Sequence, residues 1–157
     1  MLAQLWIWIA IAAGVLAAGL AALVWAVLRK PKRATVERAR KLFHLQRERA
    51  EHQFFTLAAR SGKPRGLEWT DCEFEDGVSL ARERQSGRLQ ALVGVTVRFK
   101  AIAGGGMEDN PNVGLPRAAT AVFQLDGDDW TTAGRVIFNL NPAEAIKHHQ
   151  QELEVVE

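Results

Sequence analysis

An uninterrupted apolar segment, residues 5–28, constrains this chain more than any other feature. Its 24 positions contain no charged residue, no proline and no strongly hydrogen-bonding side chain. As an α-helix that rises about 1.5 Å per residue, the segment would extend about 36 Å, enough to cross a hydrocarbon core of about 30 Å with some tilt. A buried helix in a soluble domain of this size is rarely apolar on every face over such a length. The sequence therefore predicts a transmembrane helix at residues 5–28, after a short tail at residues 1–4.

Basic residues are concentrated directly after the apolar segment. Residues 29–49 contain nine Lys and Arg and two Glu, whereas residues 50–157 contain eleven basic and sixteen acidic residues. The positive-inside rule then predicts that the C-terminal domain is cytoplasmic and that the N-terminus is outside. No Lys or Arg precedes the segment and no small-residue cleavage site follows it, which argues for an anchor rather than a cleaved signal peptide.

A basic linker at residues 29–33 joins the predicted anchor to the rest of the chain. Its charge is expected to attract the anionic headgroups of the lipid bilayer, at about 1 kcal/mol per basic residue near the surface. A nucleic-acid-binding protein would be expected to carry its basic patch on the folded domain, which here is net acidic, so no nucleic-acid partner is predicted. The residues expected to contact lipid are Arg29, Lys30, Lys32 and Arg33.

Small residues recur at every fourth position within the predicted anchor. A stripe of this kind allows two helices to approach closely, so a homodimer formed through the anchor is one expectation. Alanine is frequent in this segment, and a chance pattern is the alternative. The stripe consists of Ala10, Gly14, Ala18, Ala22 and Ala26.

After the linker, helical periodicity predicts a long amphipathic helix. Thr35 is suited to the N-cap position, and the sequence Ser61-Gly62-Lys63-Pro64 provides a C-terminal stop. Apolar residues at spacings of three and four form the face that is expected to be buried. This face comprises Val36, Ala39, Phe43, Ala50, Phe54, Leu57 and Ala58, widened by Leu42, Leu45 and Phe55.

From Leu67 onward the hydrophobic period changes to two, which is typical of β-strands. In the clearest strand, apolar residues alternate with Gln90, Thr96, Arg98 and Lys100, which predicts one buried face and one exposed face. The predicted strands are residues 67–74, 78–84, 89–101, 117–125 and 130–140.

Two further signals complete the expected layout. The sequence Asp126-Gly127-Asp128-Asp129 predicts a hairpin turn between the last two strands. Asn141 is a suitable N-cap for a short C-terminal helix over residues 143–153.

This order of elements predicts an α+β fold for residues 34–157. One long helix is expected to pack on a curled antiparallel sheet of four to five strands, with a short C-terminal helix after it. In element order the domain resembles the cystatin-like and nuclear-transport-factor-like α+β rolls. The resemblance implies a roll fold and no particular function, because a shared fold does not specify one.

The reactive side chains do not form a recognisable catalytic or metal-binding set. His44 and His52 lie two helical turns apart, about 12 Å, which is too far for both to bind one metal ion. Cys72 has acidic neighbours, whose charges would raise the pKa of its thiol. His148 and His149 are adjacent on the last helix and point in different directions. No catalytic residue, cofactor or metal ion is therefore predicted.

The connection at residues 103–116 is longer than most connections in compact domains, and such loops tend either to bind partners or to be disordered. Its glycine run looks like a phosphate loop, but it leads into acidic, proline-containing sequence rather than into a helix, so nucleotide binding is not predicted. We expect this loop to contact a protein partner. The predicted contact residues are Gly104, Gly105, Gly106, Met107, Glu108, Asp109 and Asn110.

The sequence therefore favours a non-enzymatic protein-interaction or scaffold module held at a membrane surface. The alternative is a small-ligand-binding or enzymatic roll domain with a cavity between the helix and the sheet. Polar side chains that point inward from the strands would favour this alternative.

Overall fold

The computed structural model describes residues 14, 19, 32–61 and 64–156. The chain divides into two compact units, Met1–Thr35 and Val36–Glu157. Within the described residues, no helix is long and apolar enough to cross a bilayer.

Most of the predicted anchor lies outside the described residues. Only Gly14 and Gly19 of that segment are described, and both are helical and exposed. The basic residues Arg29 and Lys30 also lie outside, as do the stripe residues Ala10, Ala18, Ala22 and Ala26. The anchor, its orientation and its self-association therefore stay predictions.

The predicted long helix is present as α2, Lys32–Ser61. The described chain is already helical at Lys32, so Thr35 lies inside the helix rather than at the predicted N-cap position. The residues of its buried face are no more than 4% exposed and comprise Val36, Ala39, Phe43, Ala50, Phe54 and Ala58.

The prediction that Leu45 widens this face is wrong, since its side chain is 83% exposed. Two residues along a helix correspond to a rotation of about 200°. Leu45 therefore points away from the sheet when Phe43 points into it.

The sheet is antiparallel throughout its described pairings, and β3 is its central strand. One edge of β3 pairs with both β1 and β2, and the other edge pairs with β4, which in turn pairs with β5 and β6. The strands are β1 Leu67–Phe74, β2 Ser79–Glu83, β3 Leu89–Ala101, β4 Arg117–Asp126, β5 Asp129–Thr131, β6 Val136–Phe138 and β7 Leu153–Val155.

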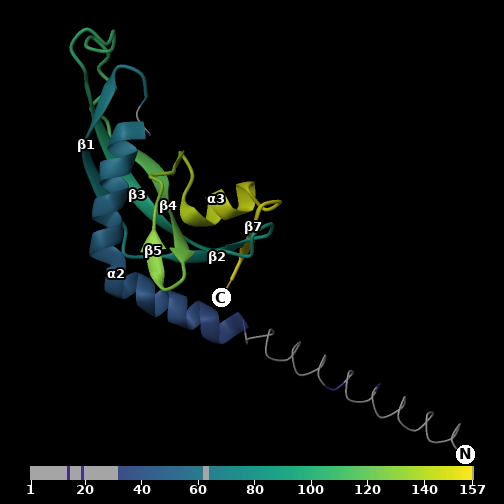
Figure 1. The fold of residues 1–157 in the computed structure, drawn as a ribbon. Coiled ribbons are helices and arrows are strands. Elements are labelled where there is room, and N and C mark those ends of the chain that lie inside the picture. Colours follow the sequence, from purple (N-terminus) through teal and green to yellow (C-terminus); the bar gives the residue numbers. More distant parts are fainter. Residues whose placement is uncertain (1–13, 15–18, 20–31, 62–63, 157) are drawn as a thin grey trace, which may run out of the picture. The chain divides into compact units, whose positions relative to one another are not determined.

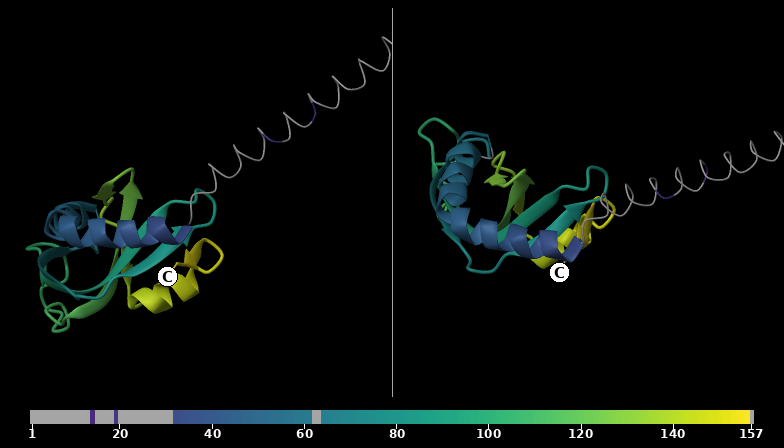
Figure 2. Two further views of the ribbon diagram at one scale, coloured as in Figure 1. Left: turned by 90° about the horizontal axis from the view of Figure 1, so that it is seen from below. Right: turned by 60° about the horizontal axis from the view of Figure 1, so that its bottom comes forward.

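The sheet curls around α2, which itself bends near its middle (Figure 1). The short helix α3, Pro142–His148, lies on the opposite side of the sheet from α2 (Figure 2). The structure therefore confirms the α+β class, the long helix on a curled antiparallel sheet, and the short C-terminal helix.

Helix α3 accounts for one difference from the predicted pattern. Gln90, expected on the exposed face of β3, is 1% exposed, and its neighbour on the same face, Leu92, is fully buried. Leu92 packs in a second apolar cluster with Ile146 of α3 and Leu153 of β7. Only the C-terminal part of β3, with Arg98 and Lys100 exposed, keeps the predicted open face.

The C-terminal helix begins as predicted and ends earlier. Asn141 and Glu144 form a capping box, in which each side chain accepts a hydrogen bond from the other's backbone N–H. The helix stops at His148, and the following segment forms β7, which pairs with β2. The predicted helix over 143–153 therefore ends five residues early.

The predicted strand over 130–140 is also interrupted, and it forms β5 and β6. Between them, Gly134 has a positive φ of 73°. A Cβ there would lie 2.7 Å from the backbone nitrogen of Ala58. Glycine thus allows this connection to approach the backbone of α2 at the point where the strand breaks.

Candidate functional site

The β3–β4 loop, residues 102–116, extends beyond the sheet at the same end as the C-terminus of α2 (Figure 1). It contains all the predicted contact residues. Its position leaves much of the loop exposed, and Gly104, Glu108, Asp109 and Asn110 are all exposed.

Backbone contacts hold the first part of the loop. The Ile102 N–H donates to the carbonyl of Gly66 at 2.9 Å, and the Gly105 N–H donates to the carbonyl of Ile102 at 2.9 Å. A Cβ on Gly105 would lie 2.8 Å from the Cα of Gly66. The two glycine backbones therefore touch, which closes the loop onto the segment before β1.

The second part of the loop consists of consecutive hydrogen-bonded turns. The N–H of Asn110 donates to Met107 O at 3.2 Å, that of Val113 to Asn110 O at 3.2 Å, and that of Leu115 to Asn112 O at 3.3 Å. The Asn110 side chain also accepts a hydrogen bond from the Asn112 N–H at 3.0 Å. The loop is therefore ordered by its own backbone.

The Glu108 carboxylate accepts a hydrogen bond from the Gly104 N–H. Backbone hydrogen bonds lower the pKa of Glu108, first that from its own N–H and then that from Gly104, with smaller contributions from Met107 and Gly106. Successive N–H groups that converge in this way form an anion-binding nest. Here the nest is occupied by the chain's own carboxylate, which differs from the open nest of a phosphate loop.

Two apolar loop residues attach the loop to the core, and a third apolar residue is exposed to solvent. Val113 is 7% exposed, and the half-buried Met107 packs against the main apolar cluster. Leu115 is 55% exposed, which makes it one of the few large apolar side chains on the described surface. Leu115 lies outside the predicted contact stretch, and no pattern in the sequence distinguishes it from an ordinary loop leucine.

The remaining reactive residues are not brought together into one site. His44, His52 and His148 are exposed. His149 approaches Glu152, with 3.7 Å between Nδ1 and the carboxylate. No group of three or more His, Cys, Asp or Glu in the described part of the chain could hold a metal ion.

The thiol of Cys72 is half-buried in β1. Burial, with smaller contributions from the charges of Asp71 and Glu51, raises its pKa to about 12. At neutral pH the sulfur is therefore protonated, whereas a nucleophilic cysteine needs to be a thiolate.

Aromatic rings fill the space between α2 and the sheet. Phe43 packs on Trp130 at 5.3 Å and on Phe123 at 5.4 Å between ring centroids, and Phe54 packs on Phe123 at 5.6 Å. The Nε1 of Trp69 is buried there, with no hydrogen-bond partner among the described residues. Two surface pockets in the described part of the chain, one beside β2 and α3 and one at Glu83, Arg84 and Glu152, both lie away from these rings.

No family model matches the chain, and no curated protein or solved structure gives a significant match to it.

Proposed function

We propose that this chain is a single-pass membrane protein whose cytoplasmic domain is a non-enzymatic protein-interaction module, with the β3–β4 loop as the contact surface. The apolar segment at residues 5–28 supports the anchor. The basic residues at 29–33 support both the orientation and a contact with anionic lipid.

The proposal rests on one combination of features. The loop is ordered by its own hydrogen bonds, and its Leu115 side chain is exposed to solvent. A flexible loop loses conformational entropy when a partner fixes it, and this loss weakens binding. Here the turns around Asn110 and the contact of Gly105 with Gly66 already restrict the loop. Such a loop can bind with little further ordering.

The exposed chemistry of the loop indicates the kind of surface that it fits. Leu115 offers an aliphatic side chain, and its burial against a partner would remove apolar surface from water, which is favourable by about 25 cal/mol per Å². Glu108 and Asp109 add exposed negative charge to the loop. A matching partner would present an apolar pocket with Lys or Arg at its rim.

The test compares two leucine variants of the full chain in native membranes. Leu115→Ser should reduce the recovery of crosslinked partners by about tenfold or more, because a leucine buried at the interface contributes about 1.5–3 kcal/mol. Leu45→Ser is the matched control, because Leu45 is also exposed but lies on α2. We expect its partner set to equal that of the wild type.

A loop replacement gives an independent test. Replacing Gly104 to Asn110 with a Gly/Ser linker removes the nest and the first turns while the strands β3 and β4 are kept. If both this variant and Leu115→Ser fold and recover the wild-type partner set, the loop is not the contact surface. The exposed side of α2 and the open face of β3 would then be examined.

A further inference from the structure

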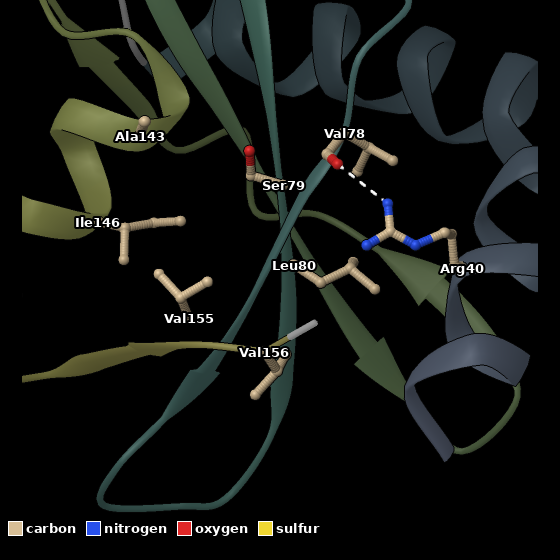
Figure 3. A pocket seen from close by; sticks show the side chains of 8 residues that line it. All are labelled: Arg40, Val78, Ser79, Leu80, Ala143, Ile146, Val155 and Val156. Carbon is tan, nitrogen blue, oxygen red and sulfur yellow. Dashed lines mark hydrogen bonds between the residues drawn. The ribbon is translucent and has the colours of Figure 1, made fainter. Parts of the chain in front are cut away.

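An open groove of about 280 Å³ crosses the edge of β2 (Figure 3). Its walls come from four elements: Arg40 from α2, Leu80 from β2, Ile146 from α3, and Val155 from β7 with Val156 after it. Ser79, on the chain at the start of β2, lies between Ile146 on one side and Arg40 on the other (Figure 3).

The groove lies beside the end of the described pairing between β7 and β2. Strand β7 pairs only with Ala81–Glu83 of β2, and the last backbone bond runs from the Val156 N–H to Leu80 O at 3.1 Å. Beyond Leu80, at Ser79 and Val78, no further strand of the described chain covers this edge of β2. The small Ser79 side chain leaves the edge open between α2 and α3.

Arg40 places a positive charge at one end of the groove. Its Nη1 donates to the carbonyl of Val78 at 3.3 Å, a long hydrogen bond. Within the described residues this is its sole hydrogen bond, and Arg40 forms no ion pair there. Its Nε and Nη2 therefore keep free donors, which form a fork of the geometry that binds a carboxylate with two hydrogen bonds.

Neighbouring arginines of α2 differ from Arg40 in this respect. Arg38 pairs with Asp128 at 2.8 Å, Arg47 with Glu51 at 2.6 Å, and Arg49 with Asp129 at 3.0 Å. Arg40 is half-buried, so water solvates its guanidinium less fully than that of a surface arginine. A half-buried cation with no carboxylate partner among the described residues is suited to bind an external one.

The rest of the groove has a mixed polar and apolar lining. Leu80 and Ile146 are buried behind it, and most of its exposed aliphatic surface comes from Val155, which is 59% exposed, and from the half-buried Val156. A hydrocarbon placed there would remove this surface from water, which is favourable at about 25 cal/mol per Å². The volume lies below the range of about 300–1,000 Å³ that is usual for drug-sized ligands, so the tail must be short.

We propose that this groove binds a small carboxylate with a short hydrocarbon tail. The carboxylate accepts hydrogen bonds from the free donors of Arg40, and the tail crosses the edge of β2 at Ser79 to contact Ile146 and Val155. The site is separate from the β3–β4 loop and does not depend on the function proposed for it.

The test titrates hexanoate into the purified full chain and follows binding by ligand-observed NMR or calorimetry. Saturable binding is expected, and hexanamide, which has the same tail without the charge, should bind about tenfold or more weakly. Arg40→Gln should weaken hexanoate binding by a similar factor. Arg49→Gln is the matched control and should bind like the wild type, because Arg49 lies on the same helix outside the groove.

A second variant keeps the test decisive if Arg40→Gln does not fold. Val155→Trp starts from an exposed side chain and fills the groove from its rim, so it should abolish hexanoate binding while the fold is kept. The proposal is overturned if hexanoate does not bind saturably, if hexanamide binds equally well, or if the folded Val155→Trp variant binds like the wild type.

Discussion

The indole N–H of Trp130 donates a hydrogen bond to the backbone carbonyl of Ala39 at 3.0 Å. Trp130 is fully buried, and it lies 91 residues from Ala39 in the sequence. Close by, the Gln46 side chain accepts from the Trp130 N–H at 2.8 Å and donates to the carbonyl of Asp128 at 2.9 Å. These bonds attach the β4–β5 hairpin to α2 through the Gln46 side chain and through the carbonyl of Ala39, whose oxygen can accept a second hydrogen bond besides the intrahelical one.

A pair of tryptophan substitutions measures this attachment. Trp130→Phe removes an N–H that is hydrogen-bonded, whereas Trp69→Phe removes a buried N–H that has no partner among the described residues. The free energy of unfolding should therefore fall by about 1–2 kcal/mol more for Trp130→Phe than for Trp69→Phe. Chemical denaturation measures both losses, and the comparison holds when the unfolding free energies of the two variants fall with denaturant concentration at the same slope. Equal losses would show that the Trp130 bond adds no net stability.

Phe54→Ala tests the core between α2 and the sheet. Phe54 is fully buried and packs against Trp69, Phe74 and Phe123. We expect the variant to lose about 3–5 kcal/mol of unfolding free energy. The half-buried Phe55, whose ring contacts Trp69, is the neighbouring control and should lose less on truncation. A loss below about 1 kcal/mol for Phe54→Ala would contradict the described core.

The raised pKa of Cys72 predicts slow alkylation in the folded protein. At pH 8, about a quarter of an unfolded cysteine is thiolate, whereas a thiol with a pKa of about 12 is thiolate in only about one molecule in 10⁴. Because the thiolate is the reactive species, iodoacetamide should react on the order of 10³-fold more slowly with the native chain than with the chain in denaturant. Cys72 is the single cysteine, so mass spectrometry reads this site directly. Equal rates would show that the thiol is not desolvated.

The lowered pKa of Glu108 predicts that the hydrogen bonding within the β3–β4 loop depends on pH. Its pKa is lowered in the folded state, so its contribution to stability is present above the pKa of an unfolded glutamate, about 4.3, and is lost as the pH falls through the lower folded value. NMR titration should find the Glu108 midpoint below those of other exposed glutamates, with the Gly104 amide shifting together with it. Glu108→Gln should remove this transition from the Gly104 amide. A Glu108 midpoint equal to the others would contradict the nest.

The proposed orientation is tested in intact cells. Nine basic residues follow the apolar segment within residues 29–49 and none precedes it. A tag placed after Glu157 should therefore resist external protease and impermeant label until the membrane is opened. A tag at the N-terminus is the matched control and should be accessible. Labelling of the C-terminal tag in intact cells would reverse the orientation.

Long elements with clear flanking signals can be predicted from this sequence. Strand β3 has the predicted bounds because its alternating pattern is long and is flanked by Gly87 and Gly104. The existence of the β3–β4 loop is predicted from its length and composition in the same way. Its internal order is not, because the nest around Glu108 depends on backbone angles such as the positive φ of Gly104.

Short elements and long-range contacts could not be predicted. Strand β7 is too short for a period-two pattern to be recognised, so neither this strand nor the groove beside it has a sequence signal. The polar contacts of Gln46 and Arg49 with the β4–β5 hairpin join residues 80 to 82 positions apart. A helix face that is simply exposed to water has the same polar composition, so the sequence does not reveal these contacts. The break between β5 and β6 depends on the approach of Gly134 to α2, which only the folded chain shows.

The attachment of α2 to the β4–β5 hairpin has a consequence for biosynthesis. At about 5–20 residues per second, a ribosome that has completed α2 needs several seconds more to reach Trp130. Under the proposed topology, α2 emerges next to the bilayer while its buried face, centred on Phe43, has no sheet to cover it. We therefore expect the nascent helix to lie on the lipid surface or on a chaperone until the hairpin is made, and to leave that surface as the domain folds.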